Sequence, residues 1–273
     1  MQKVVILTGR EIRHSYMRIR IALEKDLNVL RSYCCGTDYG VLHSQIRSNS
    51  KKQDIKLQHL ECRRQIETDM FNDFISYVTD FSNPVYADYN APNNQNVIDE
   101  IVALKPDLLL VFGACILKES IISKFPKRIL NAHLGLSPYY RGAGTNFWPL
   151  VNNAPEYVGC TFMYLDSGID TGTIIHQIRP DINIFDGPHQ IGNRLIKKMC
   201  STYAIIALNN EKILEFEELA CEKEKYYRNQ DYSSESVMKL IDNFHNGMIK
   251  EYLDNRNERD CHVPLIQQPW IDQ

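Results

Sequence analysis

The chain has 273 residues, of which 44% are hydrophobic, and carries a formal net charge of −3 at pH 7. This length suits one large domain with a small appendage or two domains, and the apolar fraction supports a real core. The charge is spread along the chain without the basic footprint that nucleic-acid binding needs, so we expect no nucleic-acid partner. No apolar run approaches the length of a membrane span, so we expect no membrane partner either.

The sequence also predicts the cellular location of the protein and the state of its cysteines. The apolar run at residues 4–7 is too short for a signal peptide, so we expect a cytoplasmic protein. The eight cysteines are then free thiols rather than a disulfide framework. Cys34 and Cys35 are adjacent, but no second pair of Cys or His residues follows at the spacing of a zinc finger. We therefore expect no bound metal.

The first half of the chain alternates between strand and helix patterns. Residues 3–8 are a β-rich apolar run that ends at Gly9 and predicts the first strand of a parallel sheet. Apolar residues at helical spacing predict a helix over 12–24, and a second strand is expected over 28–33. Residues 43–77 are predicted to be helical. Residues 83–94 contain Pro84 and Pro92 and are predicted to be a loop.

The alternation continues through the second half. A helix over 97–104 should end before Lys105-Pro106, and the nearly all-apolar residues 107–112 predict a strand buried on both faces. We then expect a short helix over 118–124, strands over 128–131, 158–165 and 173–179, and a long helix over 191–208. This order predicts an α/β fold with a doubly wound, Rossmann-like, mostly parallel sheet. Ligands bind such sheets outside the carboxyl ends of the strands.

The character of the chain changes near residue 217. A charge run at 222–225 precedes an aromatic and polar stretch at 226–232, and helical spacing returns over 237–252. We therefore predict a main catalytic domain over 1–216 and a small helical appendage over 217–273. The appendage is expected to pack on the core or on a second subunit, which would make a homodimer.

Three residues have the chemistry for moving a one-carbon acyl group to an amine. Asn131 can hydrogen-bond a carbonyl oxygen as negative charge develops on it, and His133 can move the proton of the amine. Asp170 can orient the histidine or stabilise its charged form. Asn131 and His133 are two apart, so they share one face of a strand, and the Gly- and Pro-containing stretch after them predicts an active-site loop. No metal and no covalent enzyme intermediate are required.

These residues carry a resemblance to a known family. The segments Asn-Ala-His at 131–133, Ser-Pro-Tyr-Tyr-Arg-Gly at 137–142, Gly-Cys-Thr at 159–161 and Asp-Ser-Gly-Ile-Asp-Thr-Gly at 166–172 stand in family order and spacing. They resemble the formyltransferases, which include glycinamide ribonucleotide transformylase, methionyl-tRNA formyltransferase and the sugar N-formyltransferases. The resemblance implies an Asn131–His133–Asp170 triad and 10-formyltetrahydrofolate as cosubstrate. It also implies a cis peptide bond before Pro138.

The resemblance implies a folate site along two loops. Its residues are Phe112, Gly113, Ala114, Cys115, Ile116, Leu117, Leu165, Asp166, Ser167, Gly168 and Ile169. The free N–H groups of a helix start and nearby guanidinium groups predict an anion site for the acceptor after the first strand, although a structural ion pair is an equal alternative there. The predicted acceptor residues are Gly9, Arg10, Arg13, Tyr139, Arg141 and Gly142.

The acceptor is the open question. The tail resembles those of sugar N-formyltransferases, so a nucleotide-linked amino sugar is the first expectation. Glycinamide ribonucleotide and methionyl-tRNA remain alternatives as acceptors, and so does hydrolysis of formyltetrahydrofolate with water in place of the amine. A non-catalytic folate- or nucleotide-binding module is a further alternative, against which the intact triad argues.

Overall fold

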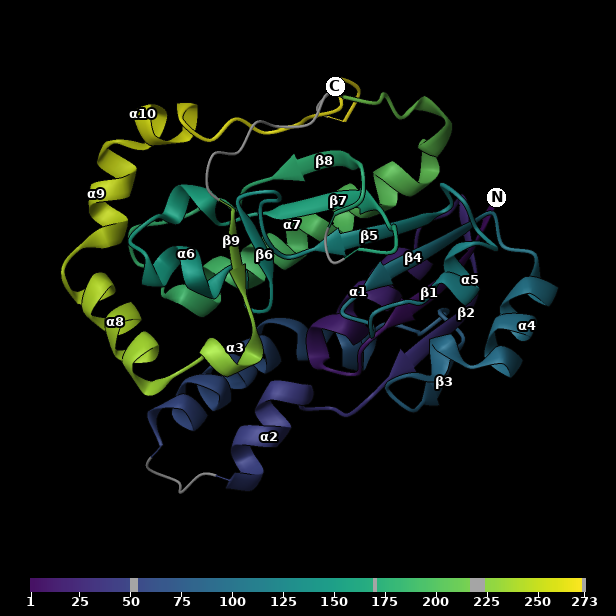
Figure 1. Ribbon diagram of the computed structural model, residues 1–273, viewed down its shortest axis with the longest axis horizontal. Helices are drawn as coiled ribbons and strands as arrows, with labels where there is room; N and C mark the ends of the chain where they lie inside the picture. The colour runs from purple at the N-terminus through teal and green to yellow at the C-terminus, as the bar shows by residue number, and fades with distance from the viewer. Residues whose placement is uncertain (50–53, 169–170, 217–223, 272–273) are drawn as a thin grey trace.

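A computed structural model describes residues 1–49, 54–168, 171–216 and 224–271 (Figure 1). Its centre is a seven-stranded sheet in the order β3-β2-β1-β4-β5-β7-β8. The first five of these strands are parallel, and β7 is antiparallel to both β5 and β8. The bounds are β1 Gln2–Thr8, β2 Leu27–Cys35, β3 Pro84–Ala87, β4 Leu108–Phe112, β5 Ile129–His133, β7 Cys160–Tyr164 and β8 Ile174–Ile178.

The central strand β4 is buried on both faces, as its apolar run predicts. Leu108, Leu110 and Phe112 belong to one hydrophobic cluster, whereas Leu109 and Val111 belong to a second cluster on the opposite face. Alternate side chains of a strand point to opposite faces, so each face of the sheet has its own core. The doubly wound, mostly parallel α/β architecture is confirmed.

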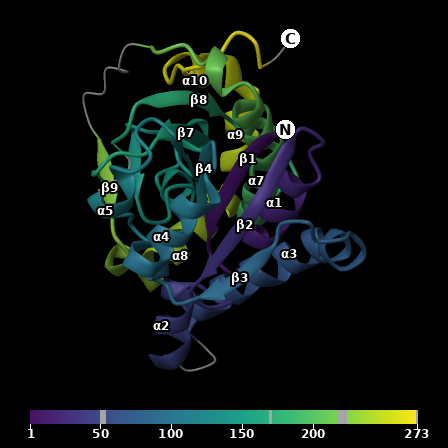
Figure 2. The ribbon, with the colours of Figure 1, turned by 90° about the vertical axis from the view of Figure 1, so that its right-hand side faces the viewer.

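Helices cover both faces of the sheet (Figures 1 and 2). α1, α3 and α7 pack against one another on the face of the larger cluster, and α4 and α5 cover the other face. The bounds are α1 Ile12–Ala22, α2 Val41–Asn49, α3 Ile55–Tyr77, α4 Gln95–Leu104, α5 Glu119–Ile122, α6 Phe147–Val151 and α7 Pro188–Leu208. Asp54 caps α3, because its carboxylate accepts a hydrogen bond from the backbone N–H of Lys56. Among the described residues, no helix combines the length and apolar character needed to cross a bilayer.

The predicted loop over 83–94 is wrong in its first part, because residues 84–87 form the edge strand β3. Pro84 stands at the first position of this strand, where its missing N–H disturbs the ladder least. A proline therefore did not exclude a strand here. The short 3₁₀ helix Ala91–Asn93 follows.

The predicted active-site loop also contains regular structure that the sequence did not reveal. β6, Tyr140–Gly142, pairs in parallel with β9, Lys225–Tyr227, in a separate two-stranded sheet. The Tyr227 ring stacks on Trp148 with ring centroids 4.1 Å apart. A pairing across more than 80 residues depends on the tertiary fold and leaves no local pattern.

The C-terminal helices pack on the main core. They are α8 Ser234–His245, α9 Met248–Asp254 and α10 Arg256–Cys261. Leu240, Met248 and Tyr252 are buried in the larger cluster together with residues of the sheet. Gly247, with a φ of 81°, separates α8 from α9, where the sequence predicted helical structure throughout 237–252. The domain boundary after residue 216 remains a prediction.

Candidate active site

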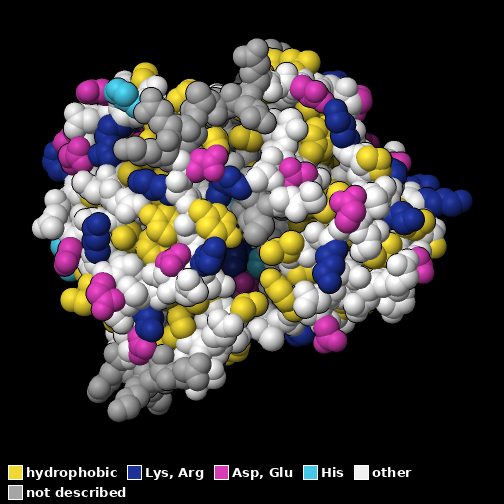
Figure 3. Space-filling model, in the orientation of Figure 1, with side chains coloured by type: hydrophobic (Ala, Val, Ile, Leu, Met, Phe, Trp, Pro, Cys, Tyr) yellow, Lys and Arg dark blue, Asp and Glu magenta, His cyan; other side chains and the backbone are white. Residues whose placement is uncertain are grey.

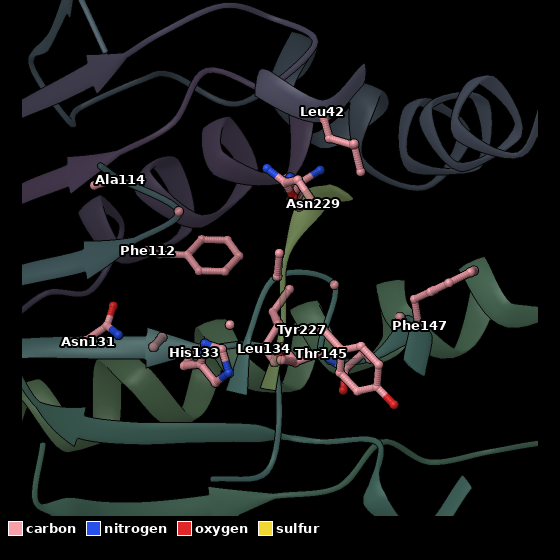
Figure 4. A pocket seen from close by; sticks show the side chains of 18 of the residues that line it. Leu42, Phe112, Ala114, Asn131, His133, Leu134, Thr145, Phe147, Tyr227 and Asn229 are labelled. Atoms are coloured by element: carbon pink, nitrogen blue, oxygen red, sulfur yellow. The ribbon is translucent and has the colours of Figure 1, made fainter. Parts of the chain in front are cut away.

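Asn131 and His133 stand at the carboxyl end of β5, as the sequence predicts. Both belong to the strand, with Ala132 between them directed to the opposite face and buried in the core. Asn131 and His133 are partly exposed, and both line a cavity of about 690 Å³. In Figure 4, His133 lies between Asn131 and the more distant Phe147.

The loop after His133 is held tightly against it. A Cβ atom at Gly135 would lie 2.8 Å from Nε2 of His133 and 2.6 Å from Thr145, so only glycine fits this position. Thr145 donates its hydroxyl hydrogen bond to the carbonyl of Leu134. The Ser137–Pro138 peptide bond is cis, as predicted.

Two buried polar side chains fix the next turn of this loop. The backbone N–H of Ser137 donates to Oγ1 of Thr161 at 3.0 Å, and that hydroxyl donates to the carbonyl of Gly135 at 2.7 Å. Gln177 donates its amide hydrogens to the carbonyl of Ser137 at 2.7 Å and to Thr161 at 3.1 Å. Strands β7 and β8 therefore position the loop that follows the candidate catalytic residues.

The cavity opens near the middle of the face shown in Figure 3, at the carboxyl ends of β1, β4 and β5. It brings together most of the predicted site residues within the described chain. Those that line it are Arg13, Phe112, Gly113, Ala114, Cys115, Ile116, Leu117, Asn131, His133, Gly142, Leu165, Asp166 and Gly168.

The loop 113–118 forms one wall of the cavity and is held by a side chain that the sequence analysis missed. The Asn93 amide donates to the carbonyl of Ile116 at 2.9 Å and to Sγ of Cys115 at 3.4 Å, and its oxygen accepts from the N–H of Lys118 at 2.8 Å. Asn93 stands about 20 residues before this loop in the sequence, at the end of a 3₁₀ helix, without a motif of its own.

The second predicted folate loop is described in part. Asp166 accepts hydrogen bonds from the N–H of Gly168 at 2.9 Å and from the hydroxyl of Thr171 at 2.8 Å. Ser167 is exposed and is not among the residues that line the cavity. Ile169 and Asp170, the third member of the predicted triad, lie outside the described residues.

Arg13 belongs to a compact group of charges at the start of α1. Its guanidinium donates to Glu11 at 2.8 Å and to Glu67 of α3 at 3.0 Å, and Arg63 donates to Glu11 at 3.2 Å. Burial raises the pKa of the Glu11 carboxyl, but Arg13 and Arg63 outweigh it and bring the pKa down to about 2. Two carboxylates thus balance two guanidinium groups, which is the arrangement of a structural ion-pair cluster.

The other predicted acceptor residues do not face the cavity, apart from Gly142. Arg10 pairs with Asp38 at 3.0 Å. Tyr139 packs edge-on against Tyr157, and Arg141 pairs with Glu224 at 2.6 Å. Gly9 is buried under the ring of His14. The neighbouring Tyr140 is buried.

His14 is a cavity-lining residue that the sequence analysis did not single out. Its Nδ1 accepts a hydrogen bond from the N–H of Glu11 at 3.2 Å, so in the neutral ring the proton is on Nε2. Burial, assisted by the charge of Arg13, lowers the pKa of His14 to about 3. Gly113 leaves room for this ring, because a Cβ atom there would lie 2.2 Å from Nε2.

The chain belongs to the formyl transferase family. The sequence model of that family, described as formyl transferase, matches residues 43–205, which is more than half of the 273 residues. The resemblance that the sequence motifs suggested is therefore confirmed. Within the described residues, no group of three or more His, Cys, Asp or Glu side chains is placed to hold a metal ion.

Individual relatives match shorter stretches. The methionyl-tRNA formyltransferase of Clostridioides difficile is 38% identical over 104 residues, which cover 37% of this chain and 32% of the relative. The methionyl-tRNA formyltransferase of Alkaliphilus oremlandii is 35% identical over 102 residues. The chain thus spans about a third of the length of these curated relatives.

Solved structures support the fold. A 4-N formyltransferase from Francisella tularensis has a TM-score of 0.54 and 18% identity, with coverage of 85% of this chain and 78% of that one. Glycinamide ribonucleotide transformylase 1 from Symbiobacterium toebii has a TM-score of 0.53 and 18% identity. The match covers 80% of this chain and 91% of that one. At these identities the likeness shows the shared Rossmann-like architecture alone.

Proposed function

We propose that the chain is an N-formyltransferase that moves the formyl group of 10-formyltetrahydrofolate to the amine of a small-molecule acceptor, a nucleotide-linked amino sugar. The observation that carries this proposal is the placement of Asn131 and His133 side by side at the end of β5, facing a cavity of about 690 Å³. Amide and imidazole groups so placed can act on one carbonyl at the same time.

Each residue then has a defined task. The amide N–H of Asn131 donates to the formyl oxygen as negative charge develops on it. His133 supports the same oxygen or relays the proton of the attacking amine toward the leaving nitrogen, with Asp170 as the group that orients it. The amine must arrive unprotonated, so we expect the rate to rise with pH above neutrality.

The wall at 113–118 suits a flat heteroaromatic donor. Cys115 and Leu117 are buried apolar side chains of this loop, and the backbone groups of 112–117 and 165–168 offer donors and acceptors to a ring edge. The folate supplies the activated formyl group. The protein contributes its orientation and the exclusion of water around it.

The choice of acceptor rests on charge. The formal net charge is −3, and the guanidinium groups of Arg13 and Arg63 that line the cavity are balanced by Glu11 and Glu67. A tRNA acceptor needs surplus positive charge along a broad surface, whereas a small sugar does not. The curated relatives named methionyl-tRNA formyltransferase match over only about a third of their length, so methionyl-tRNA stands as the second candidate.

A screen tests the proposal directly. The purified chain is incubated with 10-formyltetrahydrofolate and, in separate arms, a panel of nucleotide-linked 3-amino and 4-amino sugars, glycinamide ribonucleotide, and initiator methionyl-tRNA. We expect one amino sugar to gain the mass of a formyl group. Formylation of the tRNA alone would replace the sugar by the second candidate, and release of tetrahydrofolate without any amine would identify a hydrolase. In this proposal the reaction is cytoplasmic, and a homodimer through residues 217–273 is the expected assembly.

A further inference from the structure

Four segments that are far apart in the sequence meet at the end of the cavity away from β4. The His59 ring of α3 lies 4.7 Å from that of His189 of α7 and 5.4 Å from that of Phe147 of α6, measured between ring centroids. Nδ1 of His59 lies 2.8 Å from the hydroxyl of Tyr232, which precedes α8. Together with Asn193, these residues line the cavity. We call this group the α3–α7 end.

The α3–α7 end contains buried polar atoms that the protein leaves unpaired. Neither Nε2 of His59 nor Nδ2 of Asn193 has a hydrogen-bond partner among the described residues. Asn193 is only 2% exposed, so bulk water has little access to hydrogen-bond its amide. Buried amides in folded proteins are almost always hydrogen-bonded. An unpaired one in a cavity wall is explained when a ligand supplies the partner.

The α3–α7 end is polar without surplus charge. Burial, with the nearby charge of Arg63, lowers the pKa of His59 to about 4, and burial together with His59 lowers the pKa of His189 to about 3. Both rings are therefore neutral near pH 7. The Arg63 guanidinium is held by Glu11 and Glu67. The five residues of the α3–α7 end include no charged side chain, so they offer hydroxyl groups neutral donors and acceptors beside aromatic rings.

We propose that the α3–α7 end binds the amino-sugar ring of the acceptor, with the side chains of Asn193 and His59 hydrogen-bonding its hydroxyl groups. This inference rests on the proposed function and places the ring away from the ion-pair cluster at Arg13. Tyr232 belongs to the C-terminal part of the chain and holds His59 in place, so this part contributes to acceptor selection. In Figure 4, His133 lies between Asn131 and Phe147, which belongs to the α3–α7 end, so an amine on the ring can approach the formyl group there.

The test compares two variants and a control. Asn193→Leu removes the amide at similar volume, and His59→Phe keeps the ring packing but removes both nitrogens. The control Asn96→Leu makes the same chemical change at an exposed position of α4. For each protein, Michaelis constants are measured for the amino sugar that the screen identifies and for the formyl-folate donor. Binding of 5-formyltetrahydrofolate is followed by calorimetry.

We expect Asn193→Leu and His59→Phe each to raise the Michaelis constant for the amino sugar about 10-fold or more, which corresponds to the loss of about one good hydrogen bond. The Michaelis constant for the folate and the binding of 5-formyltetrahydrofolate should change less than about 2-fold, and Asn96→Leu should leave all of them unchanged.

The outcomes distinguish a failure of the proposed ring site from a failure of the proposed acceptor. If the wild-type chain formylates an amino sugar and both variants keep its Michaelis constant, the α3–α7 site is overturned while the formyl transfer stands. Equal losses for sugar and folate in both variants would make these side chains structural and also overturn the site. If the wild-type chain formylates no amino sugar, the proposed acceptor and the site fall together.

Discussion

Asn131 and His133 are two residues apart in β5, and this spacing places both side chains in the candidate site. Alternation along β5 turns both side chains to one face, and the end of the strand leaves that face open to the cavity. Ala132, between them, anchors the strand in the core. The two side chains thus gain their geometry from the sheet and add little to its packing.

Replacing either side chain should therefore abolish most of the activity and preserve the fold. We expect His133→Ala and Asn131→Ala each to lower kcat by about 100-fold or more, because each removes a proton relay or an oxyanion donor. Asp170→Ala is predicted to have a comparable effect. Single-turnover formyl transfer measures the rate, and thermal unfolding checks the fold. Near-native turnover of His133→Ala would contradict the mechanism.

Buried histidines give a second residue-scale prediction. The folded-state pKa values of His14 and His189 are about 3 and that of His59 is about 4, against an ordinary value of 6.5. Below pH 6.5 these histidines are protonated in the unfolded chain but remain neutral in the folded chain. The free energy of unfolding therefore falls as the pH is lowered. Each of the three should contribute about 1 kcal/mol of this loss between pH 6.5 and 5.5.

Urea titrations at pH 7.5, 6.5 and 5.5 measure this slope. The largest part of the loss should appear between pH 6.5 and 5.5, where carboxylates still change little. In His59→Gln one of the three groups is gone, so the free energy of unfolding should fall less steeply over the same interval. An identical slope in wild type and variant would show that His59 is not buried in its neutral form.

At the scale of elements, the parallel strands and long helices are the parts that the sequence predicts well. The apolar run of β4 and the helical spacing of α7 are strong local signals, because each element is buried over most of its length. β3 is weaker, since only its pairing with β2 makes residues 84–87 a strand. β6 and β9 depend on each other across the sequence, so neither carries a signal alone.

The residues of the candidate site also fall into two groups, those found in local sequence motifs and those brought there by tertiary packing. Asn131, His133 and the 112–117 loop lie in local motifs, so sequence reasoning finds them. His59 and Asn193 line the cavity only through the packing of α3 and α7. Asn93 holds the wall loop from a 3₁₀ helix and carries no motif of its own. The ion pair of Arg13 with Glu67 also depends on tertiary packing, because Glu67 lies on a helix 54 residues further along the chain. The acceptor role of Arg13 stays a prediction.

The Asn93 clamp yields a prediction for the loop element 113–118. Asn93→Ala removes the amide that holds Ile116, Cys115 and Lys118, so the wall of the proposed folate site should loosen. We expect the Michaelis constant for the formyl-folate donor to rise about 10-fold, while that for the acceptor changes little. Asn94→Ala is the control, because this neighbour is exposed and makes no side-chain cap to α4. Equal effects of the two variants would contradict the clamp.

At the scale of the whole molecule, the C-terminal segment reaches back to the loop of the candidate site. Ile266 exchanges hydrogen bonds with Gln177, since its N–H donates to the Gln177 side chain at 3.1 Å and its carbonyl accepts from the Gln177 backbone at 2.7 Å. The same Gln177 side chain holds the carbonyl of Ser137 in the loop after His133. The end of the described chain therefore shares a hydrogen-bonded network with residues that flank the site.

Gln268 secures this segment and is the place to test its contribution. Its backbone N–H donates to Nδ1 of His176 at 3.0 Å, and its amide donates to the carbonyls of Ile175 at 3.0 Å and Leu214 at 2.7 Å. Its side-chain oxygen accepts from the N–H of Leu214 at 3.0 Å. The substitution Gln268→Leu keeps the volume and removes these side-chain hydrogen bonds, so the carbonyls of the buried Ile175 and of the more exposed Leu214 lose this donor.

We expect Gln268→Leu to lower the free energy of unfolding by about 2 kcal/mol, because unpaired buried groups cost about 1–3 kcal/mol. The adjacent Gln267 is exposed, so Gln267→Leu makes the same chemical change outside the network and should alter stability by less than about 0.5 kcal/mol. Urea unfolding of both variants, beside formyl-transfer rates, distinguishes anchoring from a local surface effect. If Gln268→Leu unfolds at the same urea concentration as Gln267→Leu, the segment is not anchored through this side chain, and support for the Ser137 loop must come from β7 and β8 alone.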